Sequence, residues 1–257
     1  MASNKTSREG FFAQLGRTYA APPWSLFDVG LVLGVLAVTL MMIGSVLASL
    51  LSPDNLVPTP TGLVIGWTVG LVLAAAFVVV RWRSSSEKFA ALRIVSESAQ
   101  SKRPLILMFI FGIGVGLLAN VTAGLGSANQ FATIAPLQGI YSTFEIRPLL
   151  LGIIFAVIVQ PLAEGLIFFG VIQPRLRATL GGYFGLLITA LLYAGTHYLV
   201  YGLRPDVVIN PLWYGFIAPF VLALMFGVVR VWMRSTRAVI IANIGAGIVA
   251  ILVMLAV

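Results

Sequence analysis

Seven long apolar runs dominate this sequence of 257 residues. A helix needs about 20 apolar residues to cross a bilayer, and a spanning segment must satisfy its own backbone hydrogen bonds. The runs are continuous rather than alternating, which favours helices over strands. The sequence therefore predicts an all-α polytopic membrane helix bundle of about seven transmembrane helices. They lie at roughly residues 26–51, 61–80, 105–124, 149–173, 183–202, 211–233 and 238–257.

The composition supports an integral membrane protein. Hydrophobic residues make up 60% of the chain, charged residues 9%, and the mean hydropathy is +1.04. Such values do not describe a soluble surface. There is no cysteine, which excludes cysteine-based metal binding and nucleophilic catalysis. With a single histidine as well, the chain offers too few ligands for the usual catalytic zinc site, so neither a metal nor another cofactor is predicted.

The basic residues predict the orientation. The net charge is +8, and the basic residues flank the apolar runs, which indicates contact with anionic lipid rather than with nucleic acid. Of the 16 Lys and Arg residues, only Arg147 and Arg204 fall outside if the N-terminus lies in the cytoplasm. We therefore predict a multi-pass membrane protein with its N-terminus in the cytoplasm and its C-terminus outside. The expected location is a bacterial or archaeal plasma membrane, which the basic residues themselves do not decide.

The chain is predicted to have one domain. Residues 1–25 form a cytoplasmic N-terminal segment, and residues 26–257 form a single transmembrane domain whose first apolar run is too long for a signal peptide. Two polar stretches, 8–20 and 83–103, are candidates for helices on the cytoplasmic surface. A solvated Ser-rich linker is an equal alternative for the second stretch.

Glu164 is the one acidic residue that falls well inside an apolar run. An ionisable side chain in mid-span costs a few kcal/mol, so it is usually paired or faces a polar cavity, and it marks a functional site by default. The structural alternative is a protonated Glu that bonds to a neighbouring helix for packing. His197, the only histidine, lies in the next span. On its own, such a residue is more often interfacial or structural.

Two stretches resemble motifs of the CPBP family, the CAAX-protease and bacteriocin-processing group of intramembrane endopeptidases. The segment "EGLIFFGVIQPRLRATLG" follows the family's E-E-x-x-F-R-G pattern at Glu164, Phe168 and Gly170. The segment "YAGTH" supplies Tyr193 and His197 of a pattern that resembles F-x-x-x-H. The combined spacing of the two motifs is more specific than either motif alone.

The resemblance covers about residues 148–250 and includes four departures. Gly165 replaces the second Glu of the first motif, and Phe169 replaces its Arg. In the third motif, Asn243 stands at the position of a second His, and Gly247 stands at the position of an Asn. Joint loss of the Glu and the Arg leaves no orphan charge, which indicates that the fold was kept while the site changed.

The resemblance implies an intramembrane endopeptidase in which Glu164 is the general base and His197 is its partner in activating water. It places Asn243 on the oxyanion side, where the missing side chain of Gly247 would lower the rate by about 10²- to 10³-fold. The expected substrate or partner is a membrane-embedded or lipid-anchored polypeptide. Because four motif positions differ, whether the chain is an active enzyme is left open here.

Two other functions stay open. The first is a catalytically inactive relative that acts as a membrane scaffold, a binding platform or a subunit of a membrane complex. The second is a carrier that uses Glu164 for a small solute or a proton. It has little support, because the sequence shows no inverted repeat of the kind that carriers contain.

Counting residues gives an expectation for the depth of the site. At about 1.5 Å per residue from the inner end of each span, Glu164 lies about 15 Å deep, His197 about 20 Å and Asn243 about 8 Å. These depths do not converge, but tilted helices, a longer fourth helix or different span boundaries would close the gap, and the family-like motif spacing favours a common site over the count. Near the inner interface, Arg175 and Arg177 are expected to snorkel toward water. The alternative is that they grip an acidic lipid or a substrate tail.

Glycines of the third span suggest where helices approach closely. Gly112, Gly114 and Gly116 resemble the small-residue patterns of closely packed membrane helices, although glycine is also an ordinary residue of such helices.

Overall fold

The computed structural model describes residues 10–18, 20–52, 59–94, 102–126, 146–202 and 212–256. Within these ranges every regular element is an α-helix or a π-helical segment, the latter labelled η. The first half contains α1 (Phe11–Gly16), α2 (Leu26–Ala37), η1 (Val38–Gly44), α3 (Ser45–Leu50), α4 (Pro60–Arg83), α5 (Ser86–Ala91) and α6 (Lys102–Gly126). The second half contains α8 (Ile146–Ile153), η2 (Ile154–Val159), α9 (Gln160–Glu164), η3 (Gly165–Ile172), α10 (Gln173–Leu180), α11 (Gly182–His197), η4 (Tyr198–Gly202), η5 (Trp213–Ile217), α12 (Ala218–Met233) and α13 (Thr236–Ala256).

Seven helices of the described chain are long and apolar enough to cross a membrane, which confirms the predicted all-α polytopic bundle. They are Leu26–Leu50, Thr61–Arg83, Pro104–Val121, Leu149–Leu180, Gly182–Val200, Gly215–Met233 and Thr236–Val253. The fourth helix is longer than predicted, because the chain continues as α10 after the apolar run ends. It stops at Gly181, whose φ of 90° is a conformation that favours glycine. The protein is thus an integral multi-pass membrane protein.

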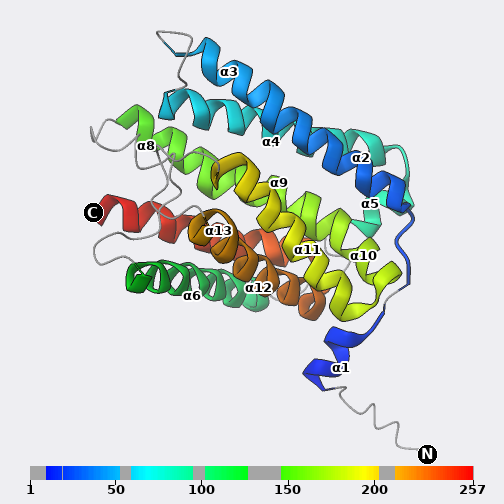
Figure 1. Cartoon of the computed structure of the whole chain (residues 1–257). Helices are drawn as coiled ribbons and strands as arrows, with labels where there is room; N and C mark the ends of the chain where they lie inside the picture. Colours follow the sequence, from blue (N-terminus) through cyan, green and yellow to red (C-terminus); the bar gives the residue numbers. More distant parts are fainter. Residues whose placement is uncertain are drawn as a thin grey trace, which may run out of the picture.

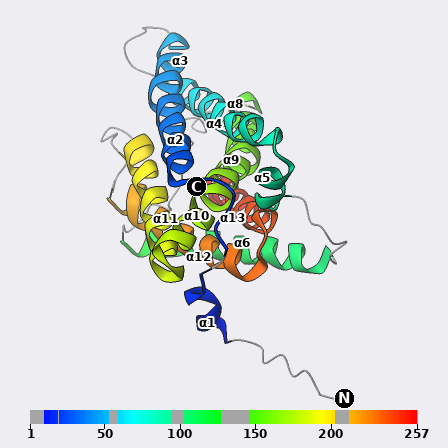
Figure 2. The ribbon, with the colours of Figure 1, turned by 90° about the vertical axis from the view of Figure 1, so that its right-hand side faces the viewer.

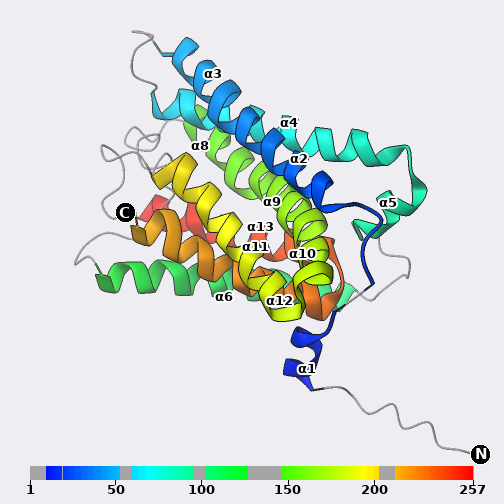
Figure 3. The same ribbon diagram turned by 45° about the vertical axis from the view of Figure 1, so that its right-hand side comes forward.

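The fourth span runs through the middle of the bundle (Figures 1 and 3). Helices α2, α3 and α4 pack together along one side of it, and α6 lies on the opposite side against α13. Helix α13 also contacts η2, α9 and η3, while α11 packs between α10 and α12. The core along the fourth span contains Phe155, Ile167, Phe168, Phe169 and Phe226, each at most 1% exposed.

The π-helical segment η3 offers backbone carbonyl groups to other parts of the chain. The Nε atom of Arg230 donates a hydrogen bond of 3.0 Å to the carbonyl oxygen of Phe169. Nε1 of Trp24 donates one of 3.1 Å to the carbonyl oxygen of Val171. Such bonds matter in a bilayer, because an unsatisfied backbone group inside hydrocarbon costs several kcal/mol. They also tie α12 and the segment before α2 to the fourth span.

The small-residue pattern of α6 is confirmed for two of its three glycines. A Cβ atom at Gly112 would lie 1.8 Å from the carbonyl oxygen of Ala242, and one at Gly116 would lie 3.0 Å from Cα of Ala246. Both positions face α13, so the missing side chains allow α6 and α13 to approach closely. Gly114 has nothing within 4 Å and takes no part in this contact.

The two polar stretches that were candidates for surface helices contain short helices. The first holds α1, which lies at one end of the bundle near α11 and α12 (Figure 2). The hydroxyl of Tyr183 in α11 contacts α1 by donating a hydrogen bond of 2.7 Å to the carbonyl oxygen of Phe12. The second stretch holds α5 and the start of α6, and its residues 95–101 lie outside the described part of the chain.

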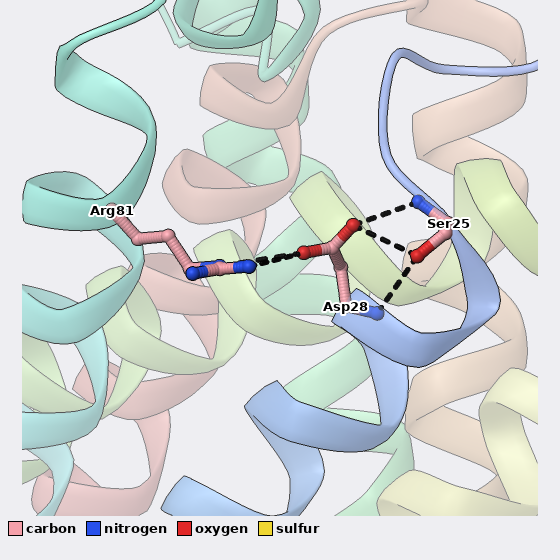
Figure 4. Close-up of polar contacts among 3 residues, drawn as sticks. All are labelled: Ser25, Asp28 and Arg81. Atoms are coloured by element: carbon pink, nitrogen blue, oxygen red, sulfur yellow. Dashed lines mark hydrogen bonds and ion pairs between the residues drawn. The ribbon is translucent and has the colours of Figure 1, made fainter.

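The first span begins with a reciprocal cap. Ser25 accepts a hydrogen bond from the backbone N–H of Asp28, and the Asp28 carboxylate accepts one from the backbone N–H of Ser25 (Figure 4). Arg81, near the end of α4, donates a hydrogen bond of 2.8 Å to the same carboxylate. The cap therefore also joins the first span to the second.

Candidate functional site

The three residues predicted for the site come from three spans and lie together. Glu164 is the last residue of α9, His197 is the last residue of α11, and Asn243 lies in α13. Nε2 of His197 is 3.1 Å from Oε1 of Glu164. Nδ2 of Asn243 is 3.5 Å from Oε2 of Glu164, at the long end of hydrogen-bond distances.

The count of depths was therefore misleading, and the fourth span is indeed longer than predicted, which was one of the alternatives that would bring the residues together. Counting from span ends assumed upright, regular α-helices, whereas the fourth span contains η2 and η3 and extends to Leu180. A π-helical turn has a different rise and shifts the faces of a helix, so residue counts do not convert directly into depth.

Two further donors, which the sequence did not predict for the site, bind the carboxyl group of Glu164. Nε2 of Gln160 donates a hydrogen bond of 2.9 Å to Oε1, and the hydroxyl of Tyr193 donates one of 2.6 Å to Oε2. The sequence held a signal for each of them. Gln160 stands one helical turn before Glu164, and Tyr193 stands one turn before His197, so each shares a helix face with its neighbour.

The carboxyl group is buried and surrounded by donors. Glu164 is 3% exposed, and Tyr193 is 2% exposed. Aromatic rings close one side, because the ring of Phe168 lies 5.0 Å from that of Tyr193, and the Tyr193 ring lies 4.4 Å from the imidazole of His197. Each oxygen of Glu164 thus contacts two polar groups in an environment of low polarity, where hydrogen bonds are strong.

The glycines that replace polar residues of the family motifs lie where helices touch. A Cβ atom at Gly247 would lie 2.1 Å from the carbonyl oxygen of Ala156. One at Gly165 would lie 2.4 Å from Cγ1 of Ile240. Helix α13 is therefore packed so closely on the fourth span that neither position has space for a side chain.

Phe169, which stands at the position of the motif's arginine, is packed among other aromatic rings. It is completely buried, with ring centroids 6.1 Å from Tyr193 and 6.2 Å from Phe226. The guanidinium group that contacts this position comes instead from Arg230, through the bond to the Phe169 carbonyl. Hydrophobic packing has thus replaced a charge on the fourth span.

The chemistry available at the site is that of one carboxyl, one imidazole, one phenol and two carboxamide groups. Across the described ranges, no three His, Cys, Asp or Glu side chains gather as the ligands of a metal ion do. The carboxyl and imidazole groups can exchange a proton across their 3.1 Å contact, and the phenol and carboxamides can donate hydrogen bonds.

Comparison with known proteins identifies a family model that matches part of the chain. Neither the curated proteins nor the solved structures include a chain that matches this one. A family model described as "Type II CAAX prenyl endopeptidase Rce1-like" matches residues 146–249, a stretch that contains Glu164, His197 and Asn243. The match confirms the resemblance expected from the motifs: residues 146–249 form a region similar to the Rce1-like type II CAAX prenyl endopeptidases.

Proposed function

We propose that the protein is a glutamate-dependent intramembrane endopeptidase of low activity that hydrolyses a peptide bond in a membrane-associated polypeptide. The observation that carries the proposal is the 3.1 Å contact between Glu164 and His197, buried inside a membrane-spanning bundle. The similarity of residues 146–249 to prenyl endopeptidases supports the same reaction class. The proposed substrate is a membrane-embedded or lipid-anchored polypeptide.

Peptide hydrolysis needs a base that takes a proton from water and donors that hold the developing oxyanion. In the proposed reaction, a water molecule displaces the Gln160 amide from Oε1 of Glu164. Glu164 takes a proton from that water, and His197, beside the same oxygen, orients the water for attack. In the described part of the chain, the side-chain amide of Asn243 makes a long contact with Glu164, so it can turn toward the oxyanion. The hydroxide so formed attacks the carbonyl carbon of the scissile peptide bond, and the C–N bond of the tetrahedral intermediate breaks as the proton on Glu164 passes to the leaving amine, which returns Glu164 to its carboxylate form.

Two features of the site explain why the proposed activity is low. Both oxygens of Glu164 are already contacted by two groups each, so water must compete for the base. Gly247 supplies no oxyanion donor, and loss of one such donor lowers the rate by about 10²- to 10³-fold.

The proposal is tested by cleavage of a membrane-tethered peptide in proteoliposomes. Glu164→Gln and His197→Ala are each expected to lower the cleavage rate by about 10²- to 10⁴-fold, the range for loss of general-base catalysis. Glu87→Gln makes the same chemical change at an exposed position of α5 and should cleave like the wild type. Equal rates for all four proteins would disprove the proposal.

A second candidate function, a catalytically inactive binding platform, is favoured by a specific observation. Hydrogen bonds from Gln160 and Tyr193 satisfy the carboxyl group of Glu164, as a purely structural role requires. Close helix contacts leave no space for a side chain at Gly165 or Gly247. A platform would hold a stable membrane partner in mild detergent, in the wild type and in Glu164→Gln alike. Purification of both proteins as lone monomers would count against this function.

We further propose the orientation with the N-terminus in the cytoplasm, which the distribution of basic residues supports. Because the chain has no cysteine, a single introduced cysteine can report its side of the membrane. Ser86→Cys, at an exposed position of α5, should react with a membrane-impermeant maleimide only after the cells are opened. Labelling of Ser86→Cys in intact cells would show that the N-terminus lies outside, which contradicts the proposed orientation.

A further inference from the structure

The carboxyl group of Glu164 has a different pair of neighbours on each of its oxygens. Oε1 is contacted by Nε2 of Gln160 at 2.9 Å and by Nε2 of His197 at 3.1 Å. Oε2 is contacted by the hydroxyl of Tyr193 at 2.6 Å and by Nδ2 of Asn243 at 3.5 Å. The proposed reaction activates water on the Oε1 side. On the Oε2 side, two hydrogen-bond donors reach the same oxygen from α11 and α13, so they lie beside each other.

Tyr193 carries a hydroxyl group that the motif it resembles does not have. The motif reads F-x-x-x-H, whereas this chain has "YAGTH". The hydroxyl lies inside the bundle, because Tyr193 is 2% exposed, and it is directed at the carboxyl group of Glu164. At Gly247, in contrast, the chain lacks the side chain that the third motif places on the oxyanion side. One donor is therefore missing on α13, and another is present on α11.

Packing at the two positions accounts for this exchange of donors. A Cβ atom at Gly247 would lie 2.1 Å from the carbonyl oxygen of Ala156, so α13 has no space for a side chain there. The ring of Tyr193 has its centroid 5.0 Å from the Phe168 ring and 4.4 Å from the imidazole of His197. These ring contacts hold the hydroxyl in place before a substrate binds, which is what an effective oxyanion donor requires.

We infer that, in the proposed endopeptidase reaction on which this role rests, the hydroxyl of Tyr193 stabilises the oxyanion together with the amide of Asn243. Before the reaction, the hydroxyl donates to the Glu164 carboxylate, a strong acceptor because it is charged. When Glu164 takes a proton from water, its carboxyl group becomes neutral, and negative charge develops on the carbonyl oxygen of the substrate. The hydroxyl then donates to that oxygen, which has become the stronger acceptor. Tyr193 keeps its own proton throughout.

This role of Tyr193 agrees with a low rate of cleavage. The hydroxyl must give up its 2.6 Å hydrogen bond to Glu164 before it can bind the oxyanion. A donor that makes no such bond to the base would need no exchange of partners. Tyr193 therefore replaces the donor that is missing at Gly247 only in part.

The test compares two membrane-tethered peptides that differ in one atom of the scissile bond. The first peptide has an ordinary amide, and the second has a thioamide, whose sulfur is a weak hydrogen-bond acceptor. A side chain that donates to the carbonyl oxygen loses most of its effect on the thioamide peptide. A side chain that only positions Glu164 affects the cleavage of both peptides equally.

The variants separate these two roles. Tyr193→Phe removes the hydroxyl but keeps the ring, and it introduces the residue that the motif itself has. Gln160→Leu is the matched control, because it removes a donor from the other oxygen of the same carboxyl group. Melting temperatures check that both variants fold. Glu164→Gln reports separately on the proposed endopeptidase function.

On the amide peptide, Tyr193→Phe should lower kcat by about 10²- to 10³-fold and change KM by less than about threefold, because the oxyanion forms only after the substrate binds. On the thioamide peptide, the same variant should lower kcat by less than about tenfold. Gln160→Leu should change kcat by the same factor on both peptides, to within about threefold.

A phosphinic peptide gives a second readout that does not depend on a measurable rate. Its tetrahedral anionic group imitates the oxyanion, and such analogues bind through the interactions made in the transition state. It should bind to Tyr193→Phe at least about tenfold more weakly than to the wild type, and to Gln160→Leu within about threefold of the wild type.

Equal losses of kcat on the amide and thioamide peptides in Tyr193→Phe, or unchanged binding of the phosphinic peptide, would overturn the role of Tyr193 as an oxyanion donor. The proposed function survives that result if Glu164→Gln still abolishes cleavage. If Glu164→Gln cleaves like the wild type, the proposed function fails, and the role of Tyr193 fails with it.

Discussion

The hydroxyl of Tyr193 donates a hydrogen bond of 2.6 Å to Oε2 of Glu164, and so joins the fifth span to the fourth. Gln160 and His197 contact the other oxygen of the same carboxyl group. The carboxyl group of Glu164 is therefore held by side chains of its own span and of the fifth span, and it also contacts Asn243 of α13. This arrangement serves packing and proposed catalysis together, since a base must be held in one position to act on a bound water.

Tyr193→Phe should destabilise the protein and lower its rate of peptide cleavage. Removing the hydroxyl leaves Oε2 with the long contact to Asn243, and a buried polar group that loses a partner costs about 1–3 kcal/mol. We expect the free energy of unfolding, measured by detergent titration, to fall by about 1–2 kcal/mol, and peptide cleavage to fall as well. Tyr183→Phe is the control, because its hydroxyl binds an exposed carbonyl, and it should change stability by less than about 0.5 kcal/mol. Equal effects of the two substitutions would contradict the prediction.

Much of the fold could be predicted from the sequence, because a bilayer imposes a length and a polarity on every span. The seven spans followed from apolar runs alone. The association of Glu164 with His197 and Asn243 was predicted from motif spacing. That spacing indicates which residues meet, but it does not give the helix contacts that bring them together. The role of these three residues in catalysis stays a prediction.

The remainder depends on contacts between distant segments, which local patterns do not contain. The burial of Arg177 requires the carbonyl groups of Arg17 and Gly182 to lie around it. Likewise, Arg230 comes from a distant helix to donate to a carbonyl group of η3 in the fourth span. Without these contacts, residue counts placed the site residues at different depths and Arg177 at the interface.

Restoring the family's residue at Gly247 should not restore activity. In Gly247→Asn, the new Cβ atom would lie 2.1 Å from the carbonyl oxygen of Ala156, so α13 must move away from the fourth span. That movement also draws Asn243 away from Glu164. We expect a melting temperature at least several degrees lower and a cleavage rate no higher than that of the wild type. A variant with an unchanged melting temperature and faster cleavage would contradict the prediction, because it would show that α13 can move away from the fourth span without loss of stability.

Two glycines of one helix offer a matched test of close packing. Gly112→Ala places a methyl group 1.8 Å from the carbonyl oxygen of Ala242, whereas Gly114→Ala places one in open space on the same helix. The first should lower the free energy of unfolding by about 1–3 kcal/mol, the usual penalty for overpacking. The second should leave it unchanged or raise it by up to about 1 kcal/mol, because alanine favours helices over glycine. The free energies of unfolding of the two variants are measured in parallel by detergent titration. A similar decrease in both would mean that α6 and α13 are not in contact at Gly112.

The cap of the first span should depend more on Ser25 than on Arg81. The Asp28 carboxylate is bound by both the backbone N–H and the hydroxyl of Ser25, at 2.9 Å each, and its side chain is 11% exposed (Figure 4). Arg81 reaches the same carboxylate at 2.8 Å, but its side chain is 40% exposed, and water screens exposed ion pairs. Ser25→Ala removes the capping hydroxyl and leaves the ion pair with Arg81, and it should therefore lower the free energy of unfolding by about 1–2 kcal/mol through loss of the cap. Arg81→Gln should lower it by less than about 1 kcal/mol, and by less still at high salt. If Arg81→Gln proves the more damaging change at both salt concentrations, the ion pair rather than the cap holds the start of the first span.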